Sequence, residues 1–192
     1  YTDWLWFGSL GYQSVYWTML QAKVLAFAVG MVVFLIPAIA SIIVARSIMG
    51  RQRTVSIRED EGVAYIVQLG QDVPRRFVTY VAALAALGLS IVMGFSASGQ
   101  WETVLKYLNA RTFGYTDPLF GQDVGFYFFS LPLFSFLQGW LFWSLLIILA
   151  LTVVVYMVSV SEGNVGLDPG VFAAHRGAKL HVMLLAAAIA MV

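Results

Sequence analysis

The sequence predicts an all-α fold: a multi-pass helical membrane bundle with irregular, aromatic-rich extracytoplasmic segments. Of its 192 residues, 60% are hydrophobic and only 11% are charged, and the mean hydropathy is +0.83. Soluble domains carry about 25% charged residues, and a disordered chain would need low hydrophobicity and high charge. The apolar residues also gather in long uncharged runs separated by arginine-rich segments. These observations predict a multi-pass membrane protein.

The first predicted span is the uncharged run from Val24 to Ala45. Its 22 residues lie between Lys23 and Arg46. As a helix they extend roughly 33 Å, which is enough to cross the hydrocarbon core. Pro37 lies inside this span and removes one main-chain hydrogen bond. We therefore expect a kink at Pro37, which membrane helices tolerate as a packing feature; a functional hinge is the alternative.

The second predicted span covers residues 77–97 and carries small residues at every fourth position. This spacing places them along one stripe of a helix. Small side chains let a neighbouring backbone approach closely, which favours association of membrane helices. We interpret the stripe as a helix-packing seam rather than a pore lining. The seam residues are Ala82, Ala86, Ser90, Gly94 and Ser98.

The remaining apolar sequence predicts two further spans. Residues 124–161 contain no charge over 38 positions, which is too long for one straight span. Pro132 divides this run, so we expect the third helix over residues 133–160, roughly 42 Å long and therefore tilted. A fourth apolar run covers residues 180–192. Because the chain starts without Met and stops inside this run, we expect a piece of a longer protein with a truncated fourth span.

Arginine and lysine predict the orientation of the chain. Residues 46–76 and 161–179 together hold eight basic residues. Residues 1–21 and 98–132, counted with Lys23 at the boundary, hold three. Because cytoplasmic loops carry the excess of basic residues, we expect 46–76 and 161–179 in the cytoplasm and 1–21 and 98–132 outside the cell membrane.

The aromatic residues gather on the predicted outer side. Seven of the 29 lie in residues 1–17 and fourteen lie in residues 101–143. An interfacial belt would place Trp and Tyr at both membrane faces, so this asymmetry predicts an outer cap with buried aromatic surface. Residues 101–109 fit a short amphipathic helix within the cap. The cap residues are Trp4, Trp6, Trp101, Asp117, Gly121, Asp123, Gly125, Phe126 and Tyr127.

Two outer carboxylates, Asp117 and Asp123, are candidates for a structural or an ionic role. Asp117 precedes Pro118 in a segment punctuated by glycines, a setting in which a carboxylate accepts turn hydrogen bonds. The alternative is that both carboxylates, with nearby carbonyl groups, bind a hard cation such as Ca²⁺. The spacing matches no EF-hand loop, so we prefer the turn.

Three stretches of the chain resemble a known family of large bacterial and archaeal membrane proteins. They are YTDWLWFGSLGY at residues 1–12, GQWETVLKYLN at residues 99–109 and FGYTDPLFGQDVGFYFFSLP at residues 113–132. Together they are similar to uncharacterised protein family 0182 of the UPF series. The resemblance implies an N-terminal helical bundle followed by a large extracytoplasmic region, with this chain as an internal piece of the bundle. It implies no activity and no functional residues.

Few residues suggest chemistry. The chain has no cysteine, which excludes disulfides and thiolate sites, and its net charge of +1 gives no basic surplus for binding nucleic acid.

His175 and His181 face different directions on a helix, and neither has metal-ligand spacing. We interpret them as interfacial histidines; ligation of a haem or other pigment is the alternative. The clear spans hold no Asp, Glu, His, Lys or Arg, which disfavours an intramembrane enzyme, and we predict no cofactor.

Two functional classes follow from these features. The preferred one is a structural or interaction module that anchors a larger extracytoplasmic region or associates with a membrane complex. Its partners would be the lipid bilayer, the remaining helices and extracytoplasmic region of the same protein, and other membrane subunits. The alternative is a component of a solute or lipid transporter or channel. The kinked span and the repeat of the motif YTD at residues 1–3 and 115–117 favour this alternative.

Overall fold

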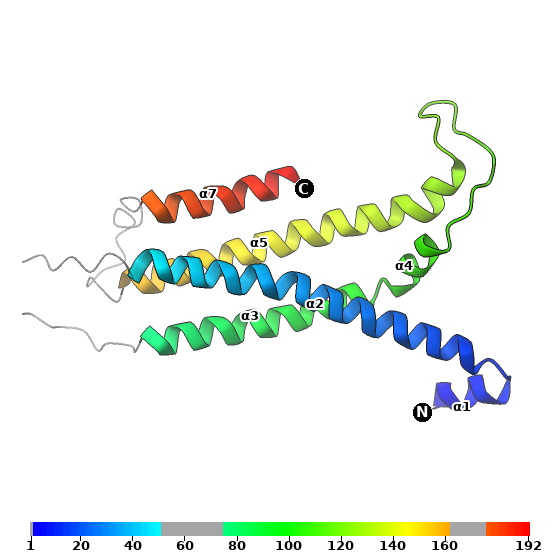
Figure 1. Ribbon diagram of the computed structural model, residues 1–192, viewed down its shortest axis with the longest axis horizontal. Helices are drawn as coiled ribbons and strands as arrows, with labels where there is room; N and C mark the ends of the chain where they lie inside the picture. The colour runs from blue at the N-terminus through cyan, green and yellow to red at the C-terminus, as the bar shows by residue number, and fades with distance from the viewer. Residues whose placement is uncertain (1, 51–74, 162–175) are drawn as a thin grey trace, which may run out of the picture. The chain divides into compact units, whose positions relative to one another are not determined.

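The computed structural model describes residues 2–50, 75–161 and 176–192. Within these ranges every regular element is helical, and an isolated bridge between Thr116 and Asp123 is the only β-type pairing. The predicted all-α fold is therefore confirmed. In chain order the elements in Figure 1 are α1 (Thr2–Ser9), α2 (Gln13–Gly50), α3 (Arg75–Ser98), α4 (Trp101–Leu108), the π-helical turn η1 (Phe126–Ser130), α5 (Leu131–Ser161) and α7 (Arg176–Met191).

Three of the described helical segments are long and apolar enough to cross a membrane, which is compatible with a membrane protein. They are Gln13–Ile48, Phe77–Ser98 and Phe126–Val158. The first begins well before the predicted Val24, because no glycine or proline separates Gln13 from the apolar run. The fourth apolar run lies in α7, a helix of 16 residues. The predicted cytoplasmic loops lie largely outside the described residues, so the orientation stays a prediction.

The chain forms two compact units. Unit 1 holds residues 1–36, 87–144 and 192, and unit 2 holds residues 37–86 and 145–191. The helices α2, α3 and α5 each contribute to both units, whereas α1 and α4 belong to unit 1 and α7 belongs to unit 2. The division of α2 falls at Pro37, where the sequence predicts a kink, and the helix continues through this residue.

In unit 1, α2 and α3 pack through glycines. A Cβ atom on Gly94 would lie 2.9 Å from the carbonyl oxygen of Phe27. A Cβ atom on Gly30 would lie 2.6 Å from a side chain of α3. The two backbones are thus closer than a larger residue would permit. The helix α5 joins this contact through Trp140, whose Nε1–H donates to the Met93 carbonyl at 3.2 Å.

The predicted seam on α3 lies mostly inside the fold. Four of its five positions are buried, two in each unit, and the fifth is half-buried. In chain order they are Ala82, Ala86, Ser90, Gly94 and Ser98. The Ser90 hydroxyl donates to a carbonyl of its own helix at 2.7 Å, so its hydrogen is used within α3.

The third span begins with a wide helical turn. The Leu131 N–H donates to the carbonyl of Phe126, five residues earlier, which closes η1. Pro132 follows directly. A proline has no N–H and its ring clashes with the carbonyl four residues before it, and a widened turn relieves that clash. The helical span therefore starts at Phe126 and crosses Pro132, and α5 itself begins at Leu131, close to the predicted start near residue 133.

The aromatic side chains of α1 are mostly exposed within this chain. Trp4 and Trp6 are exposed, and α1 has no buried residue. Trp101, at the start of α4, is half-buried. The predicted outer cap stays a prediction, because the described residues leave the aromatic surface of α1 uncovered. Because its apolar residues are consecutive, they point around the whole helix, and one neighbouring element can cover only part of them.

Candidate functional site

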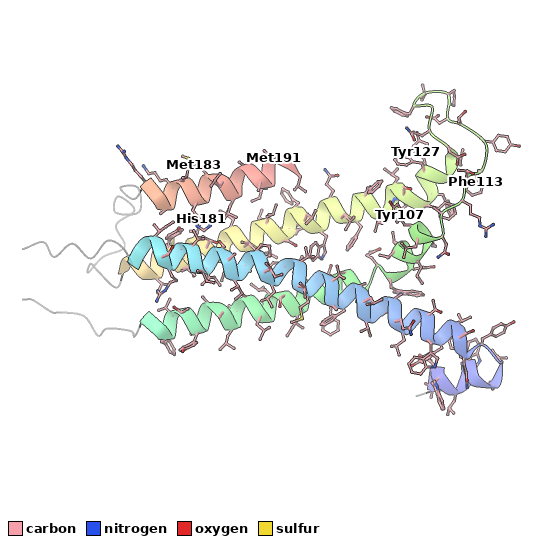
Figure 2. The ribbon with its side chains drawn as sticks, in the orientation of Figure 1. Tyr107, Phe113, Tyr127, His181, Met183 and Met191 are labelled. Atoms are coloured by element: carbon pink, nitrogen blue, oxygen red, sulfur yellow. The ribbon has the colours of Figure 1, made fainter. Side chains whose placement is uncertain are left out.

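A group of polar side chains lies inside unit 2 where α7 contacts α2 and α5. Tyr156 and Thr152 on α5 are 0% and 1% exposed, and Ser41 on α2 is also buried. His181 on α7 is half-buried and reaches both neighbouring helices (Figure 2). We call these four residues the His181 cluster.

The hydrogen bonds of the His181 cluster run in one direction. Thr152 donates its hydroxyl to the Ile148 carbonyl at 2.7 Å, so the 2.6 Å contact with Ser41 requires the Ser41 hydroxyl to donate. The Ser41 oxygen then accepts from His181 Nε2 at 3.3 Å. Nδ1 of the same ring lies 3.0 Å from the Tyr156 hydroxyl. A neutral imidazole with its proton on Nε2 satisfies these contacts when the Tyr156 hydroxyl donates to Nδ1.

The apolar surroundings explain why these hydroxyls are paired. A buried polar group without a partner costs about 1–3 kcal/mol in proteins. Thr152 bonds back to its own helix, as Ser and Thr do in membrane helices, and Ser41 reaches it from α2. Hydrogen bonds between membrane helices contribute about 0.6 kcal/mol each on average. The cluster therefore fastens α2, α5 and α7 together.

Small residues at the start of α7 bring His181 to this position. Ala178 is fully buried, and a Cβ atom on Gly177 would lie 3.2 Å from Cγ2 of Ile48 on α2. The first turn of α7 can therefore pack closely against the end of α2. His181 lies three residues after Ala178, which places both on the same face of the helix.

The residues of the cluster determine what it can do chemically. It contains one imidazole and three hydroxyls and no carboxylate. Among the described residues, no group of three or more His, Cys, Asp or Glu side chains lies where it could hold a metal ion. Such a chain of hydrogen bonds can fasten helices or pass a proton along its length. Protonation of the ring would place a second N–H at Nδ1, opposite the Tyr156 hydroxyl.

Sequence reasoning missed this cluster. It treats His181 as an interfacial residue, whereas the structure gives the ring partners on two other helices. Those partners, Ser41 and Tyr156, are 140 and 25 positions away in the chain, so no local spacing reveals them. The sequence contains one signal for such a cluster, because His181 places an imidazole at the edge of an apolar run. His175, the other histidine, lies outside the described residues.

Residues 113–125 form a hairpin in the segment predicted to lie outside, which we call the outer hairpin, and Asp123 organises it. Its carboxylate accepts hydrogen bonds from three backbone N–H groups: Phe113 at 3.0 Å, Gly114 at 2.9 Å and Gly125 at 2.6 Å. Gly114 has a φ of 75°, a left-handed conformation that favours glycine. These donors, with the Phe113 N–H first, hold the pKa of Asp123 below its ordinary value of 3.8.

Asp117 forms the turn at the tip of the outer hairpin. Its carboxylate accepts from the Phe120 N–H at 3.0 Å and from the Tyr127 hydroxyl at 3.1 Å. The Phe120 N–H is the main reason that the pKa of Asp117 lies below 3.8. Gly121, whose φ is 66°, donates its N–H to the Asp117 carbonyl at 2.8 Å. Asp117 thus makes the turn hydrogen bonds that its position before Pro118 suggests.

The cation-binding alternative for Asp117 and Asp123 stays a prediction. Both carboxylates already accept N–H or O–H donors. A hard cation needs several oxygen ligands turned toward one point, and it would compete with these donors for the same carboxylate oxygens.

Unit 2 also has an apolar groove between α3 and α5. Its volume is about 260 Å³. The α3 wall includes Phe77, Val81 and Ala85, and the α5 wall includes Leu151, Val154 and Val158. Because these lining side chains are all apolar, the groove offers packing surface and no reactive group.

Comparisons with known proteins give a single family. Residues 1–192 match the family model described as "Uncharacterised protein family (UPF0182)". A UPF0182 protein of Pelotomaculum thermopropionicum is 32% identical, with 97% of this chain and 20% of the relative covered. One of Rhodococcus erythropolis is 35% identical over 82% of this chain and 16% of the relative. The chain thus spans about a fifth or less of these curated relatives. No solved structure matches it.

Proposed function

We propose that this chain, which belongs to the uncharacterised protein family UPF0182, is a helical membrane module that anchors a larger extracytoplasmic region or associates with a membrane complex. Its partners would be the lipid bilayer, further parts of the same protein and other membrane subunits. The proposed location is the cell membrane, with residues 1–21 and 98–132 outside and residues 46–76 and 161–179 in the cytoplasm. The excess of basic residues in the latter two segments supports this orientation.

The apolar outer surface of the three spans is the observation that carries this proposal. Within each span, only 28% to 33% of the apolar stretch is buried inside the chain. The remaining surface is aliphatic and aromatic, and its exposed side chains include Val29, Ile36, Leu84, Phe95 and Trp143. Lipid or other apolar helices must cover such a surface. By contrast, the hydroxyls of the His181 cluster are buried and paired with one another.

Co-purification of the full-length protein from native membranes tests this proposal. A tagged protein is extracted in mild detergent, and bound proteins and lipids are identified by mass spectrometry. We expect a second membrane subunit at fixed stoichiometry, or a tightly held annulus of lipid around a monodisperse full-length protein. Recurrent recovery of one small water-soluble solute in place of these would contradict the proposal and favour transport.

A transporter or channel component is the second candidate, and the His181 cluster is the observation that favours it. Ionisable residues among apolar helices mark ion and proton pathways in many membrane proteins. Proton flux into liposomes that contain the full-length protein would test this function. If it transports protons, His181→Gln should abolish the flux and Lys179→Gln on the same helix should leave it unchanged. If the protein is a module, neither the unmodified protein nor either variant should conduct protons.

A further inference from the structure

The tip of the outer hairpin exposes two large apolar side chains. Leu119 is 84% exposed and Phe120 is 74% exposed. Single exposed apolar residues are common on protein surfaces, whereas large contiguous apolar patches mark interaction surfaces.

Hydrogen bonds inside the hairpin hold the tip in one conformation. Three main-chain bonds of 2.8–2.9 Å cross it, from the N–H of Asp117 to the carbonyl of Gln122, from Gly121 to Asp117, and from Val124 to Tyr115. The Asp117 and Asp123 carboxylates add side-chain bonds to backbone N–H groups on both sides. These hydrogen bonds hold the backbone of the tip in the conformation in which Leu119 and Phe120 are exposed.

The base of the hairpin is fixed to the first turn of the third span. The Phe113 ring stacks on that of Phe129 in η1, with 5.9 Å between centroids and 6° between planes. A Cβ atom on Gly125 would lie only 2.5 Å from the Arg111 carbonyl. Phe113 and Tyr127 lie at this end of the helix in Figure 2. The tip is therefore held beside the point where the chain enters its third apolar span.

The chemistry around the tip fits a lipid surface. The two carboxylates of the hairpin are engaged by backbone N–H groups of the hairpin and by the Tyr127 hydroxyl of η1, so neither is directed at a basic partner. Arg111 at its base is exposed and is the type of residue that contacts lipid phosphate. Exposed apolar side chains continue from the hairpin into the span at Val124 and Phe128. A bilayer that covers the span would also cover this surface.

We propose that the outer hairpin is a membrane-contacting finger whose Leu119 and Phe120 side chains insert into the headgroup and acyl boundary of the leaflet beside the third span. The occupant of this surface is the bilayer of the same membrane. This contact would fix the level of the third span in the membrane, whether the bundle is a module or a transporter.

Spin-label accessibility in the full-length protein tests this proposal. Phe120→Cys, and separately Leu119→Cys, are labelled in a background otherwise without cysteine and placed in bilayers of phosphatidylcholine and phosphatidylglycerol. The matched control is Gln122→Cys, an exposed polar position on the same hairpin. Collision with oxygen, which dissolves in lipid, is compared with collision with a water-soluble nickel chelate. The ratio of oxygen collisions to nickel collisions should be several-fold higher for labels at positions 119 and 120 than for the label at position 122.

Two results would overturn the proposal. Equal ratios at all three positions, typical of aqueous labels, would show that the tip lies in water. Protection of 119 and 120 from both reagents would show that protein covers the tip in place of lipid. Asp123→Asn in the Phe120→Cys background provides a further check, because loss of the charged acceptor should loosen the hairpin and lower the oxygen-to-nickel ratio at 120.

Discussion

The bond from the Thr152 hydroxyl to the Ile148 carbonyl makes Ser41 a donor to Thr152, so that Ser41 accepts from His181 Nε2. With a proton on Nε2, Tyr156 and Ser41 each contact one nitrogen of the His181 ring. The series of hydrogen bonds ends where the Thr152 hydroxyl donates to the Ile148 carbonyl. A second proton on the ring would reverse the hydrogen bond with Tyr156, whose oxygen would then accept, and would bring a charge among apolar helices. The cluster therefore fastens helices best with a neutral imidazole.

Removal of the Tyr156 hydroxyl should weaken the attachment of α7. We expect Tyr156→Phe to reduce the free energy of unfolding by about 0.6 kcal/mol, and by no more than about 1.7 kcal/mol, because the His181 Nδ1 loses its donor. Titration with a denaturing detergent in mixed micelles measures the change. The matched control is Tyr80→Phe at an exposed position of α3. Equal effects of the two substitutions would show that the hydrogen bond contributes nothing.

Asp123→Asn should loosen the outer hairpin. An amide has one carbonyl oxygen in place of two equivalent carboxylate oxygens and no charge, so it cannot serve the N–H groups of Phe113, Gly114 and Gly125 as well. Hydrogen exchange over residues 113–125 should become faster, measured by mass spectrometry. Asp3→Asn on α1 is the control and should leave this exchange unchanged. Unchanged hydrogen exchange in Asp123→Asn would show that the Asp123 carboxylate does not stabilise the outer hairpin.

The outer hairpin should also loosen in acid. Because backbone N–H groups lower the folded-state pKa of Asp123 below 3.8, the folded hairpin binds its proton less readily than the unfolded one. The contribution of this carboxylate is therefore complete above about pH 3.8 and is lost as the pH falls through the lower, folded-state pKa. Limited proteolysis across this range should show increasing cleavage within residues 113–125. Equal cleavage throughout would refute this linkage.

The role of a residue was predictable from the sequence only where its hydrogen-bond partners lie close to it in the chain. The turn at Asp117 follows from the neighbouring proline and glycines, because its acceptors and donors lie within a few residues. The role of His181 depends on Ser41 and Tyr156, which come from other helices. Helical periodicity gives the face of a residue, but it does not give the helix that this face meets.

At the scale of elements, the contact between α2 and α3 depends on glycine. A glycine-to-alanine change in a helix normally stabilises by about 0.8–1.0 kcal/mol. We expect the opposite sign for Gly94→Ala, because the new Cβ would lie 2.9 Å from the Phe27 carbonyl. Gly88→Ala on the same helix is the matched control, since its Cβ would meet nothing within 4 Å. Detergent unfolding of both variants tests the contact, and stabilisation by Gly94→Ala would disprove it.

The sequence located the spans better than it located their ends. Hydropathy marks the apolar run of a helix, but α2 begins at Gln13, before that run, and the third span begins at Phe126 through the π-helical turn. A proline suggests a break, yet the wide turn lets the helix cross Pro132. The exposure of Trp4 and Trp6 leaves the aromatic cap a prediction, because burial depends on neighbours that the local pattern does not specify.

At the scale of the molecule, the apolar outer surface and the paired polar interior support a membrane module. The three spans bury at most a third of their apolar stretches within the chain. The His181 cluster has hydrogen-bond partners without any contribution from water. A transporter would instead need water to reach polar groups near the middle of the membrane.

Water access to Thr152 is the most direct test of this account. Thr152→Cys in the full-length protein, in a background otherwise without cysteine, is treated with a charged, membrane-impermeant thiol reagent from each side of the membrane. Asn109→Cys, at an exposed position after α4, is the reactive control. A dry module predicts no modification of Thr152→Cys during the time in which Asn109→Cys reacts completely. Rapid modification of Thr152→Cys from either side would contradict the module and establish a water-filled path to the His181 cluster.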